Sequence, residues 1–223
     1  MVVRVAERAR KSGAAEVLIA TDHPRIAAAA REHGFAAVMT RAGHASGTDR
    51  IAEVAARRRY PSAHIVVNVQ GDEPLIEPAL IRQVAGALAR DRSAHMATAC
   101  HPIRSARELV NPNVVKVVLG GDGCALYFSR AAVPYARDAF ARRIGRIPMG
   151  LPAYRHLGIY AYRAGFLRTF TRLKPAALER FEALEQLRAL AHGYRIAVCM
   201  ARRAPHPGVD TPADLARVRR EYR

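Results

Sequence analysis

The stretch His64-Ile65-Val66-Val67-Asn68-Val69-Gln70-Gly71-Asp72-Glu73-Pro74 decides the fold. Its first six residues are mostly apolar and β-branched, and the run is too short for a helix, so it is typical of a central strand buried on both faces. The polar residues that follow lie just past the carboxyl end of that strand, where open α/β sheets bind ligands. Gly71 lets a ligand approach the backbone closely. Asp72 is placed to hold a metal ion on a phosphate, because Mg²⁺ is typically bound by one or two carboxylates together with phosphate oxygens.

Helices and strands alternate around this strand. We expect helices at 2–11, 24–34, 48–58 and 78–90, and strands at 16–21, 35–39 and 64–69. This rhythm predicts an α/β fold with a mostly parallel sheet and helices on both faces.

The middle of the sequence, from residue 96 to residue 162, adds β structure that could run antiparallel, and one more strand lies near the end. Further strands are expected at 96–103, 114–119, 125–129, 155–162 and 196–200. Residues 176–190 read as one amphipathic helix with Leu178, Phe181, Leu184 and Leu187 on its apolar face, and a last helix starts at Pro212. No repeat or linker divides the chain, so a single domain over residues 1–223 is expected.

The composition is that of a globular protein with a strong positive charge. The chain has 223 residues, of which 50% are hydrophobic, and a net charge of +17. Only three of the basic residues are lysines, and arginine abundance of this kind often reflects genome composition. The charge still implies attraction to anions, either nucleotides or nucleic acids.

The three cysteines, Cys100, Cys124 and Cys199, are odd in number and lack C-x-x-C spacing. This pattern argues against a disulfide framework or a zinc site and fits a reducing cytoplasm. No apolar run approaches the length of a membrane span, and the first residues show no secretory pattern. We therefore expect no membrane partner.

Residues 40–50 lead from an expected strand into an expected helix. Ser46, Gly47 and Thr48 can offer backbone N–H and hydroxyl groups at a helix N-terminus, which is a natural site for an anion or a base. An ordinary helix cap explains the same residues.

Residues 155–160 alternate along an expected strand, so His156, Gly158 and Tyr160 share one face. Gly158 would leave open space between two side chains that can hydrogen-bond. A structural histidine beside a packed tyrosine is the alternative.

Two groups near the end of the chain carry further polar residues. Glu182, Glu185 and Gln186 have i, i+3, i+4 spacing and could line a pocket for a hydroxylated ligand, or form a solvated flank paired with arginines. Thr211 and Pro212 suit a helix start, which leaves Asp210 as a possible second metal carboxylate.

Several long motifs resemble one family. They are residues 20–23 (ATDH), 40–41 (TR) with 46–50 (SGTDR), 67–74 (VNVQGDEP), 111–118 (NPNVVKVV), 125–130 (ALYFSR), 155–160 (RHLGIY), 184–188 (LEQLR) and 209–212 (VDTP). In this order, over residues 1–223, they resemble 3-deoxy-manno-octulosonate cytidylyltransferase, the CMP-Kdo synthetase family.

The resemblance implies a Rossmann-like nucleotidyltransferase fold, a three-layer sandwich, usually as a homodimer. It implies transfer of CMP from CTP to the sugar acid Kdo, with release of pyrophosphate, for lipopolysaccharide biosynthesis. Mg²⁺ would be held by Asp72 and Asp210. The cytidine would lie among Ser46, Gly47, Thr48 and Arg50. The sugar acid would be bound by Gln70, Arg130, His156, Tyr160, Glu182 and Gln186, with Arg130 on its carboxylate.

Members of that family begin with a strand and a triphosphate-binding loop, and Met1 aligns with the first helix after that loop. We therefore expect this segment to be missing from the sequence as given, which would weaken CTP binding and turnover. The expected strands at 16–21 and 65–69 would then each present an unpaired backbone edge.

Two other functions stay open. One is a cytidylyltransferase for another sugar acid. The other is a basic nucleic-acid-binding protein, which the charge favours. Scattered arginines, an aromatic content of only 6% and the lack of a familiar nucleic-acid motif argue against it, so we expect no nucleic-acid partner.

Overall fold

The computed structural model describes residues 1–204 and 206–222. The helices are α1 (Val2–Arg10), α2 (Pro24–Glu32), α3 (Gly47–Arg57), α4 (Pro78–Arg90), α5 (Ala106–Val110), α6 (Ala164–Phe170), α7 (Ala177–Glu182), α8 (Gln186–Ala191) and α9 (Pro212–Glu221). The strands are β1 (Leu18–Thr21), β2 (Ala36–Met39), β3 (Ile65–Asn68), β4 (Met96–Pro102), β5 (Lys116–Leu119), β6 (Ala125–Ser129), β7 (Tyr154–Arg163) and β8 (Ile196–Met200). The single domain expected over 1–223 stays a prediction, and two of its residues, Pro205 and Arg223, lie outside the described residues.

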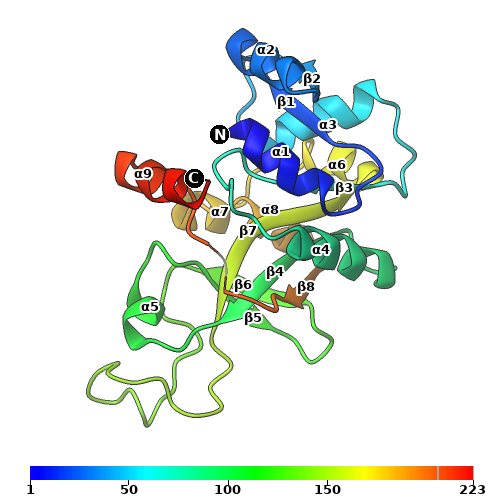
Figure 1. Ribbon diagram of the computed structural model, residues 1–223. Coiled ribbons are helices and arrows are strands. Elements are labelled where there is room, and N and C mark those ends of the chain that lie inside the picture. Colours follow the sequence, from blue (N-terminus) through cyan, green and yellow to red (C-terminus); the bar gives the residue numbers. More distant parts are fainter. Residues whose placement is uncertain (205, 223) are drawn as a thin grey trace.

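The larger sheet is built around the long strand β7 (Figure 1). The strand order is β6-β5-β7-β4-β8, and β3 also pairs with β7. β3, β4 and β5 all run antiparallel to β7, whereas β8 runs parallel to β4. The α/β class and the antiparallel strands in the middle are as expected. The sheet is mixed rather than mostly parallel, because β7 is inserted between strands that share one direction.

β1 and β2 form a separate parallel pair, with Leu18 beside Ala36. Within residues 1–204 and 206–222, β1 pairs only with β2, and β3 pairs only with β7. One backbone edge of β1 and one of β3 are therefore unpaired, as the sequence analysis expected.

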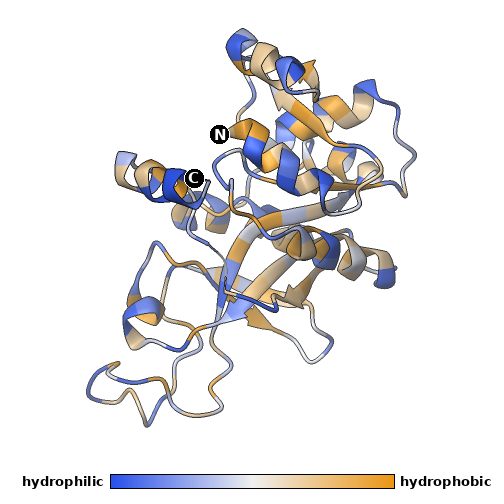
Figure 2. Ribbon diagram, in the orientation of Figure 1, coloured by the Kyte–Doolittle hydropathy of each residue, from blue (hydrophilic) through white to orange (hydrophobic). Residues whose placement is uncertain are grey.

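Helices cover both faces of the larger sheet. On one face α4 contributes Leu80, Val84 and Leu88, which pack with Leu157 and Ala161 of β7. On the other face the core contains side chains from α3, α6 and α8: Ala55, Phe166, Leu167, Phe170 and Leu187. Burying each large apolar side chain contributes about 1.5–3 kcal/mol. Figure 2 shows the corresponding pattern, with hydrophilic residues on the outer surfaces of the helices and apolar residues on the strands between them.

The helix expected over 176–190 is wrong, because the chain breaks it into α7 and α8. Ala183 adopts the left-handed conformation, with φ of 50°. Leu184 and Leu187 are buried as expected, but Leu178 and Phe181 are exposed. Glu182 ends α7 and Glu185 precedes α8, so the three polar residues do not share one helix face.

A long loop between β6 and β7 extends away from the rest of the molecule (Figure 1). It is anchored by a small apolar cluster in which Phe140 packs with Ile103, Leu109 and Ala153. Within the described part of the chain, no helix combines the length and the apolar character that crossing a membrane requires.

Candidate active site

The turn after β3 and the segment before α9 meet at Asp72. The backbone N–H of Val209 donates to the carbonyl of Asp72 at 2.9 Å, and a Cβ at Gly208 would lie 3.8 Å from Oδ2 of Asp72. Asp210 follows directly. Among the described residues, neither the Asp72 nor the Asp210 carboxylate has a hydrogen-bond or ion-pair partner within the chain. Two free carboxylates on touching segments are the hard oxygen donors that suit Mg²⁺.

Other protein ligands are few. Within residues 1–204 and 206–222, no three His, Cys, Asp or Glu side chains gather closely enough to hold a metal ion by themselves. A cation at Asp72 and Asp210 would therefore take its remaining ligands from water or from a phosphate, as Mg²⁺ commonly does. Gln70, which was predicted to bind the sugar acid, lies exposed at the start of the same turn.

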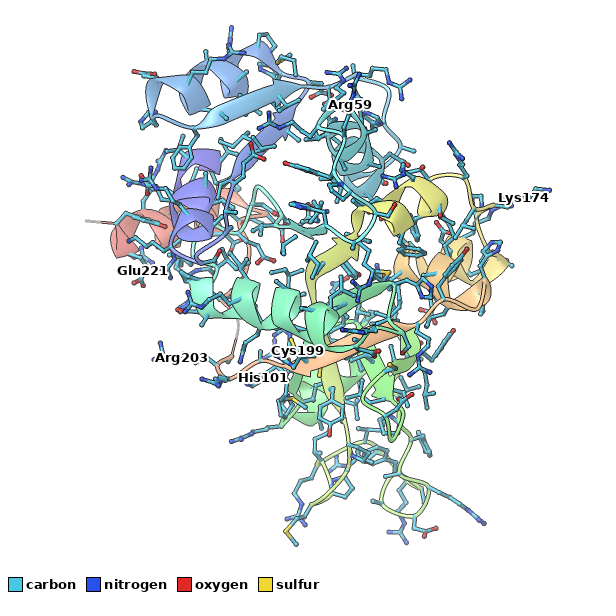
Figure 3. All side chains as sticks on the ribbon, turned by 90° about the vertical axis from the view of Figure 1, so that its right-hand side faces the viewer. Arg59, His101, Lys174, Cys199, Arg203 and Glu221 are labelled. Atoms are coloured by element: carbon cyan, nitrogen blue, oxygen red, sulfur yellow. The ribbon has the colours of Figure 1, made fainter. Side chains whose placement is uncertain are left out.

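Glu73 lies next to Asp72 and is the most perturbed carboxyl group of this region. Burial, and then the neighbouring charge of Asp72, raise the pKa of Glu73 to about 7. Its side chain borders a cavity of about 280 Å³ between the start of α4 and the segment after β8, which is also lined by Glu77, Gln83 and His206. Arg203, on the far wall, points outward at the molecular surface (Figure 3).

Residues 40–50, here called the α3 loop, end in a capped helix start. Ser46 is the N-cap of α3, and its Oγ accepts from the backbone N–H of Asp49 at 3.2 Å. Among the described residues, the backbone N–H groups of Gly47 and Thr48 have no partner within the chain. A Cβ at Gly47 would lie 3.8 Å from Nδ2 of Asn68, at the end of β3. The helix start therefore offers free donors next to the turn that carries Asp72.

Arg50 is held in place by the segment after β1, a contact that the sequence analysis missed. Its guanidinium pairs with Asp22 at 2.9 Å and donates to Oγ1 of Thr40 at 2.5 Å. The ATDH motif at 20–23 was the available signal. On its other side the α3 loop borders an open cavity of about 620 Å³, where His44 pairs with Glu53.

One face of β7 carries His156, Gly158 and Tyr160, as the alternation predicted. Gly158 is exposed, and a Cβ there would meet no atom within 4 Å. The His156 and Tyr160 rings lie 5.3 Å apart. Tyr160 also stands opposite Asn68 in the β3–β7 register, so this face adjoins the α3 loop.

His156 is neutral. Burial lowers its pKa to about 3. Thr98 donates its only hydroxyl proton to the carbonyl of Ile159 at 2.7 Å, so Nε2 of His156, 2.9 Å from Oγ1 of Thr98, is assigned as a donor. Nδ1 then keeps a lone pair and can accept a hydrogen bond from a ligand hydroxyl.

Lys116, Ser129, Arg130 and Glu182 form a compact group, here called the Arg130 cluster. The Glu182 carboxylate accepts from Ser129 Oγ at 2.7 Å and from the Arg130 backbone N–H at 2.8 Å. Burial of Glu182 opposes ionisation, but these hydrogen bonds outweigh it and lower its pKa. Both carboxylate oxygens of Glu182 are thus engaged inside the protein, which leaves it less able to bind a ligand than expected.

Glu185 is better suited to that role, although it was not assigned one. Its Oε2 accepts from the hydroxyl of Thr48 at 2.7 Å, whereas its Oε1 is buried without a partner among the described residues. Gln186 beside it is buried, and Tyr162 approaches Thr48 at 3.3 Å. The i, i+3 spacing of Glu182 and Glu185 was the only signal in the sequence, and it did not distinguish them.

A series of contacts thus links several of the predicted residues. Contacts link Gly47 to Asn68, Asn68 to Tyr160 and Tyr160 to His156, and the His156 ring lies 5.0 Å from that of Phe128, near Arg130. Carboxylates lie at one end, an arginine lies at the other, and a neutral polar strand face runs between them. This arrangement can bind a phosphorylated ligand and a polyhydroxylated acid side by side.

Comparisons with known proteins agree with this chemistry. A family model described as cytidylyltransferase matches residues 1–196. Among solved structures, the chain is similar to a CMP:2-keto-3-deoxy-manno-octonic acid synthetase complexed with CTP, with 41% identity and a TM-score of 0.87, covering 99% of this chain and 86% of that one.

Two more distant structures share the fold. A 4-diphosphocytidyl-2C-methyl-D-erythritol synthase is 8% identical with a TM-score of 0.59, covering 100% of this chain and 89% of that one. A putative glucose-1-phosphate thymidylyltransferase from Bacillus anthracis, in complex with a sucrose, is 11% identical with a TM-score of 0.61, covering 99% and 81%. At these identities the likeness concerns the fold alone, and the predicted α/β nucleotidyltransferase fold is confirmed.

Proposed function

The chain belongs to the cytidylyltransferase family, and on that premise we propose that it transfers the CMP group of CTP to the eight-carbon sugar acid 3-deoxy-manno-octulosonate (Kdo). The observation that carries the proposal is the 41% identity, over 99% of the chain, to a synthetase named for this product and complexed with CTP. The anomeric hydroxyl of Kdo would attack the α-phosphorus of CTP. A new phosphorus–oxygen bond forms, the bond to the leaving pyrophosphate breaks, and the hydroxyl proton passes to solvent. The product would serve lipopolysaccharide biosynthesis.

The α3 loop is proposed to bind the cytidine. The free N–H groups of Gly47 and Thr48 suit acceptor atoms of the nucleotide, and Ser46 and Arg50 fix the helix start that carries them. Asp72 and Asp210 would hold Mg²⁺, which when bound would neutralise phosphate charge. Since phosphoryl-type transfer needs mainly positioning and charge stabilisation, this chemistry requires no covalent nucleophile.

The sugar acid is proposed to lie along β7. Arg130 would bind its carboxylate, which suits the fork of a guanidinium. His156, with a lone pair on Nδ1, together with Tyr160, Gln70 and Gln186, would orient its hydroxyls. Glu182 was expected here as well, but Oε1 of Glu185 is buried without a partner among the described residues, which makes Glu185 the better acceptor.

Oligomer and location complete the proposal. A homodimer is proposed from the family resemblance, and the exposed Tyr135 and Met149 on the long loop are apolar side chains that an interface could cover. Size-exclusion chromatography with light scattering tests this. The cytoplasm is proposed because all three cysteines are free, as in a reducing compartment.

The deciding experiment measures pyrophosphate release from CTP and Mg²⁺ with Kdo, with a nine-carbon sialic acid and with no acceptor. Release that depends on Kdo supports the proposal. Release only with the other acid means a cytidylyltransferase of different specificity, and no release with either contradicts it. A fluorescence titration with duplex and single-stranded DNA at two salt concentrations tests the nucleic-acid alternative, which predicts tight binding at physiological salt.

A further inference from the structure

Lys116 is a buried cation that the proposed mechanism leaves without a role. It begins β5 and is fully buried, with 0% of its surface exposed. Burying an ammonium group is costly unless it is well hydrogen-bonded. Its Nζ donates to the backbone carbonyls of Asn111, at 3.0 Å, and Arg130, at 2.6 Å. The lysine therefore ties the turn before β5 to the residue that follows β6.

The guanidinium of Arg130 reaches the same turn from the other side. Its Nη1 donates to the carbonyl of Pro112 at 2.9 Å, and its Nε to the carbonyl of Glu182 at 2.6 Å. Its Nη2 lies 3.5 Å from the carbonyl of Ala183. Since a guanidinium has five N–H groups, one N–H on each terminal nitrogen has no partner among the described residues. Two N–H groups on adjacent nitrogens are what a carboxylate needs for a bidentate contact.

The charges of the cluster are unbalanced. Lys116 and Arg130 are two cations beside the single carboxylate of Glu182. Burial lowers the pKa of Lys116, the charge of Glu182 raises it, and the charge of Arg130 lowers it. The surplus of one positive charge is complementary to one incoming carboxylate. An apolar residue in place of Lys116 would remove both this surplus and the hydrogen bond that fixes the backbone of Arg130.

We propose that Lys116 is a positioning residue for the sugar acid: by holding the carbonyls of Asn111 and Arg130, it keeps the two free N–H groups of Arg130 directed at the substrate carboxylate. The inference rests on the proposed function. It acts through the backbone, because Lys116 is too deeply buried to touch a ligand. The positioning extends to the break between α7 and α8, because Arg130 binds the two carbonyls at that break. Glu185 and Gln186 follow directly after it.

The test compares Lys116→Met with Lys174→Met in the full chain. Lys174 lies exposed at the edge of the molecule (Figure 3), so the same chemical change there should leave the KM for Kdo and the KM for CTP unchanged. For Lys116→Met we expect the KM for Kdo to rise roughly tenfold or more, since charge-assisted hydrogen bonds are misplaced. The KM for CTP should stay within about twofold, because among the described residues no hydrogen bond or ion pair joins the α3 loop directly to the Arg130 cluster, and the two are linked only through Thr48 and Glu185. Calorimetric titration with Kdo alone should show the same loss.

A double variant tests whether Lys116 acts through Arg130. If it does, adding Lys116→Met to Arg130→Lys should leave the KM for Kdo near that of Arg130→Lys alone. Multiplying effects would mean that the lysine acts independently, and equal rises in both KM values would mean a general structural role. Either result overturns the proposal.

Lys116→Gln covers the case in which the methionine variant does not fold. Its amide can still donate to one carbonyl but carries no charge, so an intermediate rise in the KM for Kdo is expected. An unchanged KM in a folded variant that turns Kdo over refutes the role of Lys116 alone. If the unmodified chain neither binds nor uses Kdo, the proposed function fails and this inference fails with it.

Discussion

The α3 loop and the Arg130 cluster are held in place by different kinds of contact. The α3 loop is continuous in sequence, and its cap joins Ser46 to Asp49, three residues apart. The Arg130 cluster joins Arg130 to Glu182, 52 residues apart, and relies on a buried lysine. A cap between residues three apart can lose its hydrogen bond without displacing distant segments. A cluster assembled from distant segments depends on each of its charges, so substitutions there should have larger and more selective effects.

The largest effect is expected at Asp72, at the end of the site that adjoins the α3 loop. Asp72→Asn removes a carboxylate proposed to hold Mg²⁺ and should lower kcat roughly 10²-fold or more, because charge stabilisation of the reacting phosphate is weakened. Steady-state pyrophosphate release measures this. Asp138→Asn, on the exposed loop, is the matched control. Near-normal turnover in Asp72→Asn would remove Asp72 from the mechanism.

Arg130→Lys should separate the two regions by substrate. Lysine cannot reproduce a bidentate contact, so we expect the KM for Kdo to rise about tenfold while the KM for CTP changes little. Arg195→Lys, at an ion pair with Asp122 in the turn between β5 and β6, controls for loss of an arginine elsewhere. Equal rises in both KM values would count against a carboxylate contact.

The buried carboxyl group of Glu73, next to Asp72, makes the stability of this part of the site depend on pH. Its folded pKa of about 7 exceeds the ordinary value, so the folded state binds more protons than the unfolded state between about pH 4.5 and 7. The stabilisation from neutral Glu73 is complete below this window and is lost as pH rises through it to 7, by roughly 3 kcal/mol.

The substitution that isolates this effect is Glu73→Gln. This variant should lose less stability than the unmodified chain between pH 5 and 8, as measured by thermal unfolding without Mg²⁺. Glu221→Gln, at the exposed end of α9 (Figure 3), should follow the unmodified chain. Parallel pH profiles of stability for all three proteins would show that the pKa of Glu73 is not raised in the folded state.

The smallest effect should come from the cap of the α3 loop. Ser46→Ala removes the hydrogen bond to Asp49 and should cost about 1 kcal/mol of unfolding free energy. Ser105 also occupies an N-cap position, at α5, but makes no capping hydrogen bond with its side chain, so Ser105→Ala is a matched control expected to cost less. Equal costs in denaturant titrations would mean that the Ser46 hydrogen bond contributes little.

Local patterns predicted the elements whose limits are set locally. The helix over 78–90 and the strand over 125–129 have the expected bounds, because Pro78 suits a first helical position and Gly123 turns the chain before the strand. The cap at Ser46 was recognised for the same reason. The break at Ala183 was not, since the groups that take up its carbonyls belong to Arg130, far away in sequence.

The candidate site likewise contains residues that local patterns predict and residues that only tertiary contacts identify. Gly47, Asp72 and the β7 face could be found because glycine, strand ends and period-two alternation leave traces in sequence. The preference for Glu185 over Glu182 and the position of Lys116 emerged only from tertiary contacts. Two carboxylates on neighbouring turns look alike until Ser129 and Thr48 each contact one of them.

Strand β7 has a consequence for how the molecule fluctuates. It is hydrogen-bonded on both sides, to β4 along one edge and to β5 and β3 along the other. It can therefore release its amide protons to solvent only when neighbouring strands separate together, whereas the β1–β2 pair can open by itself. The face that carries His156 and Tyr160 thus belongs to the slowest-exchanging unit of the fold. The β1–β2 pair belongs to a unit that opens more often, at a lower free energy.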